Sequence, residues 1–186
     1  MSLSPVKRLI LETMWMVDKP AKAAEIAKEV GLGFPSVMMH IIGLTRMGYV
    51  EKPEEGHYAM TENGKKALGF PKVCEEMAEK ILTYLPVEKS FHFYADTGKP
   101  LNLYAASLED FCDKISEVGV GSLEFHLSRG DFEAWFTGLG DTELARKTLL
   151  FKEQKASGEE LRRKLYEIVK HRCHELAKIR ERSYQT

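Results

Sequence analysis

The chain has 186 residues and a net charge of −1, and 44% of its residues are hydrophobic. Such a chain can form one large domain or two small ones with apolar cores. It has no run of about 18 uncharged apolar residues, so neither a membrane-spanning segment nor a membrane partner is expected. The three cysteines are odd in number and widely spaced, and the N-terminus lacks the pattern of a signal peptide. These features predict a cytoplasmic protein without a disulfide framework.

The charge is unevenly distributed along the chain. Residues 1–70 carry nine Lys/Arg against eight Asp/Glu, and residues 71–87 carry two against three. Residues 88–156 carry eight against twelve, and residues 157–186 carry eight against five. No segment has the large positive excess that by itself indicates nucleic-acid binding.

Three helices are predicted near the N-terminus. The first is expected over residues 4–17, where Ser4 can act as the N-cap and apolar residues recur at helical spacing. The sequence KAAEIAKEVG predicts a short second helix over residues 22–31, which ends at a glycine. The third helix, FPSVMMHIIGLTRMG, is expected over residues 34–48.

A β-hairpin and a further helix follow the third helix. The hairpin is expected over residues 49–60, because Glu54-Glu55-Gly56 is a turn signal between two short extended stretches. Thr61 can cap the next helix, TENGKKALGF, although Gly64 in its interior is unfavourable for a helix. Three helices, a hairpin and a helix follow one another in the order of a winged helix-turn-helix domain.

This stretch also resembles a known class of domain. The residues AAEIAKEVGLGFPSVMMHIIGLTRMGYVEKPEEGHYAMTENGKKAL are similar to the winged-helix domains of metal-sensing repressors and multidrug-resistance regulators. The resemblance covers roughly residues 4–70. Its most specific parts are the xxIAxxVGL entry, the I-x-x-L-x-x-x-G-Y-V exit from the third helix and the Y-x-M-T-E-N-G-K-K-A-L close. It implies a winged helix-turn-helix domain over residues 1–70 that binds double-stranded DNA, in a class of regulators that commonly dimerise.

The third helix has few groups that can recognise DNA bases. At about 100° per residue, Val37, Ile41, Leu44 and Gly48 point to the core. Base edges are recognised mainly by hydrogen-bonding side chains, and of the outward residues only Arg46 can donate hydrogen bonds. The tip of the hairpin carries two glutamates, whereas a wing that contacts the phosphates of DNA usually has Lys or Arg at this position. The outward residues of the helix are Pro35, Met39, Ile42, Gly43 and Arg46.

The DNA-binding hypothesis therefore has an alternative. An exposed strip of methionine and isoleucine is also typical of protein-binding surfaces, so this part can be a winged-helix protein–protein interaction module without direct DNA binding. A third reading is that the second domain covers the strip. Under the DNA-binding hypothesis, which we favour, the contacting residues are Ser36, Met39, His40, Ile42, Arg46, Lys52, His57 and Lys65.

A linker helix and a second domain are expected after residue 70. The linker helix lies within residues 71–87, which are bracketed by prolines. Alternating residues at 90–95 and 101–106 predict a hairpin, and Ser107 opens a helix with a capping box. Residues 88–156 are thus expected to form a small α+β domain with an aromatic core.

The string S-L-E-F-H-L-x-R-G-D-F-E-x-W resembles an uncharacterised domain family of archaea and bacteria. The resemblance covers roughly residues 90–147 and implies no established chemistry. From the residues themselves, Ser122 and Asp131 are expected to be N-caps of two short helices, and Arg129-Gly130 is expected to be the turn between them.

A polar cluster in this string raises the question of catalysis. Asp131 and Glu133 are a carboxylate pair, and His126 can act as a base. We favour a structural role for these residues and predict no enzyme activity. The second interpretation is a ligand or effector pocket, which would be formed by His126, Arg129, Asp131 and Trp135.

The C-terminal residues 157–186 predict one long helix with an apolar stripe near heptad spacing, formed by Leu161, Leu165, Ile168, Arg172 and Ile179. This stripe or the first helix can mediate a homodimer. His171 and His174 can share a helix face, but no Cys-x-x-Cys completes a zinc site, so no metal is expected. Phosphate-binding glycine motifs are absent from the sequence, and no cofactor is expected.

The sequence as a whole predicts an α+β protein, in which a winged helix-turn-helix is followed by a small mixed domain and a long C-terminal helix. We expect a transcriptional regulator of archaeal type that inserts helix 34–48 into the major groove and uses hairpin 49–60 as the wing. The second domain would then sense an effector or mediate association.

Overall fold

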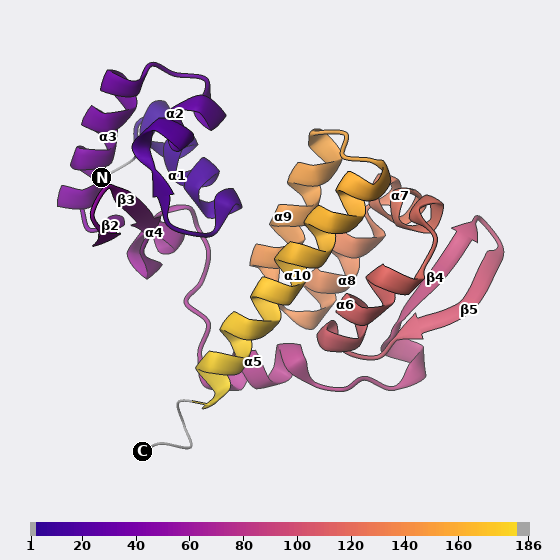
Figure 1. Cartoon of the computed structure of the whole chain (residues 1–186). Helices are drawn as coiled ribbons and strands as arrows, with labels where there is room; N and C mark the ends of the chain where they lie inside the picture. Colours follow the sequence, from indigo (N-terminus) through magenta and orange to yellow (C-terminus); the bar gives the residue numbers. More distant parts are fainter. Residues whose placement is uncertain (1–2, 182–186) are drawn as a thin grey trace. The chain divides into compact units, whose positions relative to one another are not determined.

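The structure, a computed structural model, describes residues 3–181 and has the α+β composition that the sequence predicts (Figure 1). It divides into two compact units, of which unit 1 ends at Lys72 and unit 2 begins at Val73. Within the described residues, no helix combines the length and the apolar character needed to cross a membrane.

Unit 1 begins with three helices, α1 (Pro5–Val17), α2 (Ala23–Val30) and α3 (Phe34–Arg46). The hydroxyl of Ser4 accepts a hydrogen bond from the Lys7 N–H at 3.4 Å, as expected of an N-cap. Helix α3 ends two residues earlier than expected, because Gly48 adopts a left-handed conformation and the Tyr49 N–H bonds the carbonyl of Leu44. Gly48 is therefore exposed instead of facing the core.

Unit 1 also contains a three-stranded antiparallel sheet. Strands β2 (Val50–Glu54) and β3 (His57–Met60) form the expected hairpin. A two-residue strand β1 (Ala21–Lys22) pairs with the other edge of β3, so the strand order is β1-β3-β2. Lys22 was expected to belong to the second helix and β1 was not expected, because two residues are too few to show alternation in the sequence.

The core of unit 1 lies between the three helices and the sheet. Helices α1, α2 and α3 pack against one another, α1 and α2 contact β3 and β1 respectively, and α3 contacts β2. Trp15 is buried and its ring stacks on Phe70 at 4.6 Å. Other buried residues of this core are Ile10, Leu11, Ile26, Val37, Ile41, Leu44 and Val50.

Helix α4 (Glu62–Ala67) contains the glycine that the sequence analysis found unfavourable. Thr61 caps the helix by accepting a hydrogen bond from the Gly64 N–H at 3.2 Å. Gly64 is buried, and a β-carbon there would lie 2.7 Å from Cγ of Met60 and closer still to the carbonyl oxygen of Tyr49. The missing side chain thus allows α4 to pack on the backbone that leads into the hairpin.

We expect Gly64→Ala to destabilise unit 1 by roughly 1–3 kcal/mol, because the carbonyl of Tyr49 belongs to the backbone and cannot move aside. Chemical denaturation followed by the fluorescence of Trp15, in a Trp135→Phe background, measures this effect. Gly43→Ala is the matched control within unit 1, because a β-carbon at that helical glycine meets only the flexible end of the Lys7 side chain, at 3.5 Å. An equal loss of stability in both variants would show that close packing is not the reason for Gly64.

Unit 2 contains one hairpin and six α-helices within its described residues (Figure 1). A short 3-10 turn (Val87–Lys89) precedes the hairpin. The hairpin strands are β4 (Phe91–Asp96) and β5 (Lys99–Ala105). The helices are α5 (Glu75–Leu82), α6 (Leu108–Glu117), α7 (Val120–Arg129), α8 (Asp131–Leu139), α9 (Thr142–Glu153) and α10 (Gly158–Glu181).

The segment expected to be a linker helix belongs to unit 2. Helix α5 packs on α10 and α6, and its residues Ile81 and Leu82 are buried. The Leu85 N–H also donates to the carbonyl of Ala106 at 2.7 Å, which ties the segment after α5 to the end of β5. The helix expected within residues 71–87 is therefore part of unit 2 and does not form a separate linker.

The apolar stripe of α10 packs against other helices of unit 2. Leu161, Leu165, Val169 and Leu176 are buried, and α10 packs on α5, α6, α7 and α9. Ile168 and Ile179, which the sequence analysis placed in the stripe, are only half-buried. Residues 182–186, which were expected to continue this helix, lie outside the described residues.

Helix α10 also supports the end of α6. Nη1 of Arg162 donates to the carbonyl of Val118 at 2.7 Å and also to the carbonyl of Ile115. The last carbonyls of a helix lack partners within the helix and carry partial negative charge, so a guanidinium is a suitable cap.

Aromatic rings form the centre of unit 2. The ring of Phe91 lies 4.9 Å from that of Phe93, 5.3 Å from Phe111 and 5.2 Å from Phe132. The expected aromatic core is thus largely correct, although Tyr104 is exposed and Tyr94, Phe125 and Trp135 are half-buried.

Candidate functional site

The outward face of α3 is open to solvent. Met39 is 64% exposed and Ile42 is 41% exposed, and Pro35 and Arg46 are also exposed. Val37, Ile41 and Leu44 anchor the opposite face of the helix in the core. The division of the helix into these two faces agrees with the division expected from its periodicity.

The remaining residues expected at the DNA surface differ in their accessibility. Ser36 and Lys52 are exposed, whereas His40, His57 and Lys65 are half-buried. Nδ1 of His57 lies 3.3 Å from a carboxylate oxygen of Glu54, so this histidine is engaged within the hairpin. Of the predicted cations, Arg46 and Lys52 are therefore the most accessible.

Lys7 was not expected at this face. Its Nζ lies 3.7 Å from the sulfur of Met47 and would lie 3.5 Å from a β-carbon at Gly43, so its ammonium group lies beside the outer side of α3. The sequence contains no signal for this contact, because it depends on how α1 packs on α3. Lys7 adds a second cation beside Arg46.

A shallow depression runs along the same face of α3. Its walls are mainly apolar, and a methionine, an isoleucine and a glycine in the middle of the helix make room for it. Surfaces of this composition are found where proteins bind one another. The residues that line it are Phe34, Pro35, Met38, Met39, Ile42, Gly43 and Arg46.

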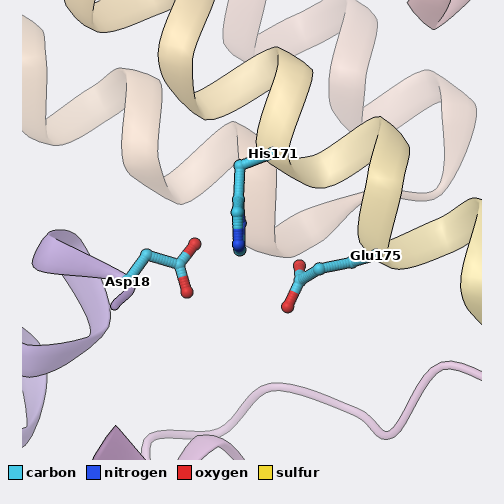
Figure 2. Close-up of side chains that lie close together, drawn as sticks. All are labelled: Asp18, His171 and Glu175. Carbon is cyan, nitrogen blue, oxygen red and sulfur yellow. The ribbon is translucent and has the colours of Figure 1, made fainter. Parts of the chain in front are cut away.

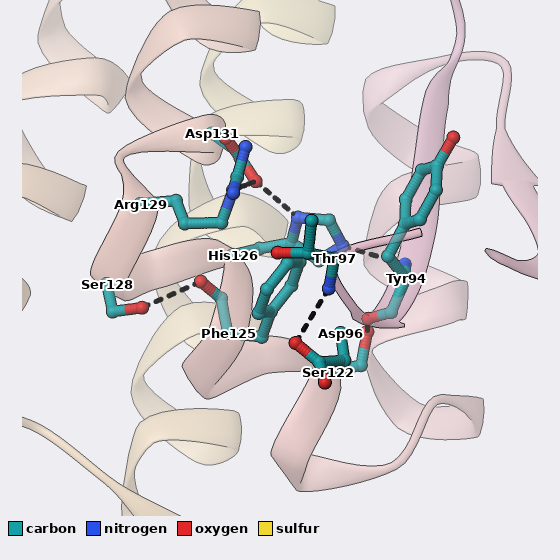
Figure 3. Close-up of polar contacts among 9 residues, drawn as sticks. All are labelled: Tyr94, Asp96, Thr97, Ser122, Phe125, His126, Ser128, Arg129 and Asp131. Carbon is teal, nitrogen blue, oxygen red and sulfur yellow. Dashed lines mark hydrogen bonds and ion pairs between the residues drawn. The ribbon is translucent and has the colours of Figure 1, made fainter. Parts of the chain in front are cut away.

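In unit 2, side chains of α7 hold the hairpin at Tyr94 (Figure 3). The hydroxyl of Ser122 donates to the Tyr94 carbonyl at 2.7 Å, and Nε2 of His126 accepts from the Tyr94 N–H at 2.9 Å. The pairing of β4 with β5 is irregular at this point. Two residues one turn apart on α7 thus replace strand hydrogen bonds that β5 does not supply.

These contacts correct the expected capping roles. Helix α7 begins at Val120 with Gly119 as its N-cap, so Ser122 lies inside the helix. Helix α8 begins at Asp131, and Gly130 in a left-handed conformation precedes it. The side chains of Ser122 and Asp131 bond to Tyr94 and His126 instead of to helix N–H groups.

The hydrogen bonds of His126 fix its tautomer. Because the Tyr94 N–H can only donate, Nε2 must be the acceptor, and Nδ1 carries the proton that it donates to Asp131 at 2.7 Å. The ring is 3% exposed, and burial lowers its pKa despite the opposing hydrogen bond and charge of Asp131. His126 is therefore neutral at neutral pH.

Neither ring nitrogen of His126 is free to act as a general base. Both ring nitrogens are occupied, so in this arrangement neither can accept a proton from a substrate. Ser122 donates to a backbone carbonyl and has no hydrogen bond to His126, so the Ser, His and Asp side chains do not form a nucleophilic triad. The cluster holds the hairpin on α7.

We expect unit 2 to lose stability on acidification because of His126. A lowered pKa in the folded state means that below the unfolded value, near 6.5, the unfolded chain binds a proton that the folded chain does not. The contribution is complete above that value and is lost as the pH falls through the folded pKa. Urea unfolding at pH 7.5 and 5.5 measures this loss, which should be smaller in His126→Gln. An equal pH dependence in the two proteins would contradict the assignment.

A cavity of about 270 Å3 lies beside this junction, between β4, its turn and α7. It includes three of the four residues expected in a ligand pocket, namely His126, Arg129 and Asp131. Trp135 does not line it, because its Nε1 donates to the carbonyl of Lys89 at 3.1 Å and its ring packs on Phe91. The other lining residues are Phe91, His92, Tyr94, Thr97, Gly98 and Phe125.

The buried thiols of unit 2 are unreactive by their environment. Burial raises the pKa of Cys112 to about 11 and that of Cys173 to about 12. Both groups are therefore protonated at neutral pH, and the thiolate needed for nucleophilic attack is scarce. All three cysteines are free.

The histidines of α10 give little support for a metal site. His171 and Glu175 project from successive turns of the helix (Figure 2), and their ligand atoms lie within 4.8 Å of each other. His174 is exposed and does not join this pair. Exposed acidic groups of this kind are common without a metal ion.

Comparisons of the chain with protein-family models, with curated proteins and with solved structures find no match.

Proposed function

We propose that unit 1 is a winged helix-turn-helix domain that binds double-stranded DNA, and that the chain acts as a transcriptional regulator in the form of a homodimer. The order α1-β1-α2-α3-β2-β3, with β1 beside β3, supports the winged-helix assignment. In such a domain α3 enters the major groove and the β2–β3 hairpin follows the adjacent backbone.

The observation that carries this proposal is the open outward face of α3. The residues that anchor α3 in the core are buried, and the opposite face carries Arg46. Within the described residues, the Arg46 side chain forms no hydrogen bond or ion pair. A free guanidinium can donate two hydrogen bonds to a guanine or to a phosphate. Met39 and Ile42 can contact thymine methyl groups.

The charges available for phosphates are moderate in number. Lys7 lies beside the face that carries Arg46, and Lys52 is exposed on strand β2 of the hairpin. With the amino end of a helix, these groups and Arg46 can supply about three or four phosphate contacts per protomer, which corresponds to about three or four units of salt slope. A dimer doubles this number, which is why we include dimerisation in the proposal.

Fluorescence anisotropy with a labelled mixed-sequence duplex tests the proposal. We expect binding at about 50 mM salt that weakens by at least roughly tenfold at about 200 mM salt, because counterions are released from each contacted phosphate. Absence of binding at low salt would contradict a DNA-binding role.

A second function is favoured by one observation, the apolar depression on α3. Its methionine and isoleucine side chains suit a protein partner better than a phosphate backbone. Met39→Glu separates the two functions, because it places a charge in the centre of the depression. Loss of a protein complex in this variant, with no DNA binding in the parent protein, would support the interaction module.

We expect Glu55→Lys to strengthen DNA binding by roughly five- to tenfold near 0.1 M salt, because it adds one phosphate contact at the tip of the hairpin. Glu55 is exposed beside Gly56, so the change does not disturb the core. The same anisotropy assay measures the gain, and Glu167→Lys on α10 is the control for net charge. Equal gains in both variants would mean that net charge, and not the hairpin, is responsible.

A further inference from the structure

The cavity beside β4 and α7 combines three properties that restrict its ligand. The first is size. Its volume of about 270 Å3 is near the lower limit of ligand pockets, which span roughly 300–1,000 Å3. A small metabolite fits within this volume.

The second property is a pair of oppositely charged side chains that both have free hydrogen-bonding groups. Nε of Arg129 donates to Oδ2 of Asp131 at 3.2 Å, and this oxygen also accepts from His126. No other hydrogen bond engages the terminal nitrogens of Arg129 or Oδ1 of Asp131 within residues 3–181. A guanidinium end and a carboxylate oxygen thus remain available side by side (Figure 3).

The third property is the apolar remainder of the wall. The rings of Phe91, Tyr94 and Phe125 line the cavity, and the guanidinium of Arg129 lies 5.1 Å from the centre of the Phe125 ring. His126 contributes only its ring surface, because both of its nitrogens are occupied. The cavity therefore offers an apolar compartment with one positive and one negative group.

We propose that this cavity binds a free α-amino acid with an apolar side chain. The ligand carboxylate accepts hydrogen bonds from the terminal nitrogens of Arg129, and its ammonium group donates to Oδ1 of Asp131. The apolar side chain lies against the rings of Phe91, Tyr94 and Phe125.

The charge balance selects a zwitterion over simpler ions. Arg129 and Asp131 cancel each other and His126 is neutral, so the wall carries no net charge from these three groups. A monoanion would place its charge beside the Asp131 carboxylate, and a monocation would place its charge beside the guanidinium. A zwitterion satisfies both groups when it excludes water from them.

The test is isothermal titration calorimetry of the full chain with L-leucine and L-phenylalanine. N-acetyl-L-leucine, which lacks the ammonium group, and L-leucinamide, which lacks the carboxylate, serve as chemical controls. We expect saturable binding of at least one of the two amino acids, with each control at least roughly tenfold weaker, because each loses a charge-assisted hydrogen bond.

Arg129→Gln is expected to weaken amino-acid binding at least roughly tenfold. Arg129 is 52% exposed, so the variant should fold. Arg163→Gln is the matched control, because Arg163 is a similarly exposed member of an ion pair. Absence of saturable binding in the millimolar range would overturn the proposal. Unchanged affinity in Arg129→Gln, or N-acetyl-L-leucine binding as tightly as L-leucine, would overturn it as well. None of these results depends on whether unit 1 binds DNA.

Discussion

Replacing Arg172 with methionine is expected to destabilise unit 2 by about 3–5 kcal/mol. The guanidinium bonds both oxygens of Asp141, at 2.7 and 3.0 Å, and it also contacts Glu143 at 2.8 Å and Glu175 at 3.0 Å. The side chains of Arg172, Asp141 and Glu143 are all less than 8% exposed. Without the guanidinium, Asp141 would lose the charge that both of its oxygens contact, and Glu143 and Glu175 would each lose one ion pair.

The pKa of Arg172 reflects the same balance. Burial lowers it, but the charges of Asp141 and Glu143 outweigh burial and raise it above the ordinary value. Asp141 also caps α9 by accepting a hydrogen bond from the Leu144 N–H at 3.1 Å. The ion pair therefore joins the start of α9 to the middle of α10.

Urea denaturation followed by Trp135 fluorescence, in a Trp15→Phe background, isolates unit 2. Arg163→Met is the control, because its exposed pair with Glu167 should contribute no more than about 1 kcal/mol. A loss of less than about 1 kcal/mol in Arg172→Met would show that the buried carboxylates find other compensation.

The second large effect is expected at Arg46. Arg46→Glu should weaken DNA binding by roughly 10- to 100-fold per protomer, because one guanidinium contact is lost and a carboxylate approaches the phosphates. It should also lower the slope of the salt dependence by about one unit per protomer. Arg163→Glu, with the same change of net charge on α10, should leave both quantities nearly unchanged. If both variants lost affinity equally, α3 would have no specific part in binding.

Local sequence signals predicted several of the helix ends correctly. Ser4, Thr61 and Ser107 accept hydrogen bonds from N–H groups three residues later, and Gly31 ends α2 in a left-handed conformation. Such motifs depend on neighbouring residues alone, and the sequence displays them directly. The faces of α3 were predictable for the same reason.

The contacts of unit 2 were not predictable in this way. Ser122 resembles an N-cap in the sequence, yet its hydroxyl bonds to the carbonyl of Tyr94, 28 residues earlier. Arg172 occupies an apolar stripe of α10, and its partner Asp141 is 31 residues earlier. Each pairing depends on how distant elements pack, which one sequence does not specify.

The candidate ligand pocket was predicted in part. His126, Arg129 and Asp131 lie within six residues of one another, so their proximity was visible in the sequence. The aromatic wall from β4 was not, because Tyr94 approaches them only through the hairpin. Trp135 was included for its place in the motif, and the structure instead packs it against the aromatic core.

The most direct test of the central claim, that α3 of unit 1 binds DNA, is a 1H–15N NMR titration of the full chain with a duplex. We expect saturable shifts of backbone amides within residues 34–46 and at Lys52, which diminish as salt is added. Saturable DNA-dependent shifts confined to unit 2, or no shifts at low salt, would contradict it.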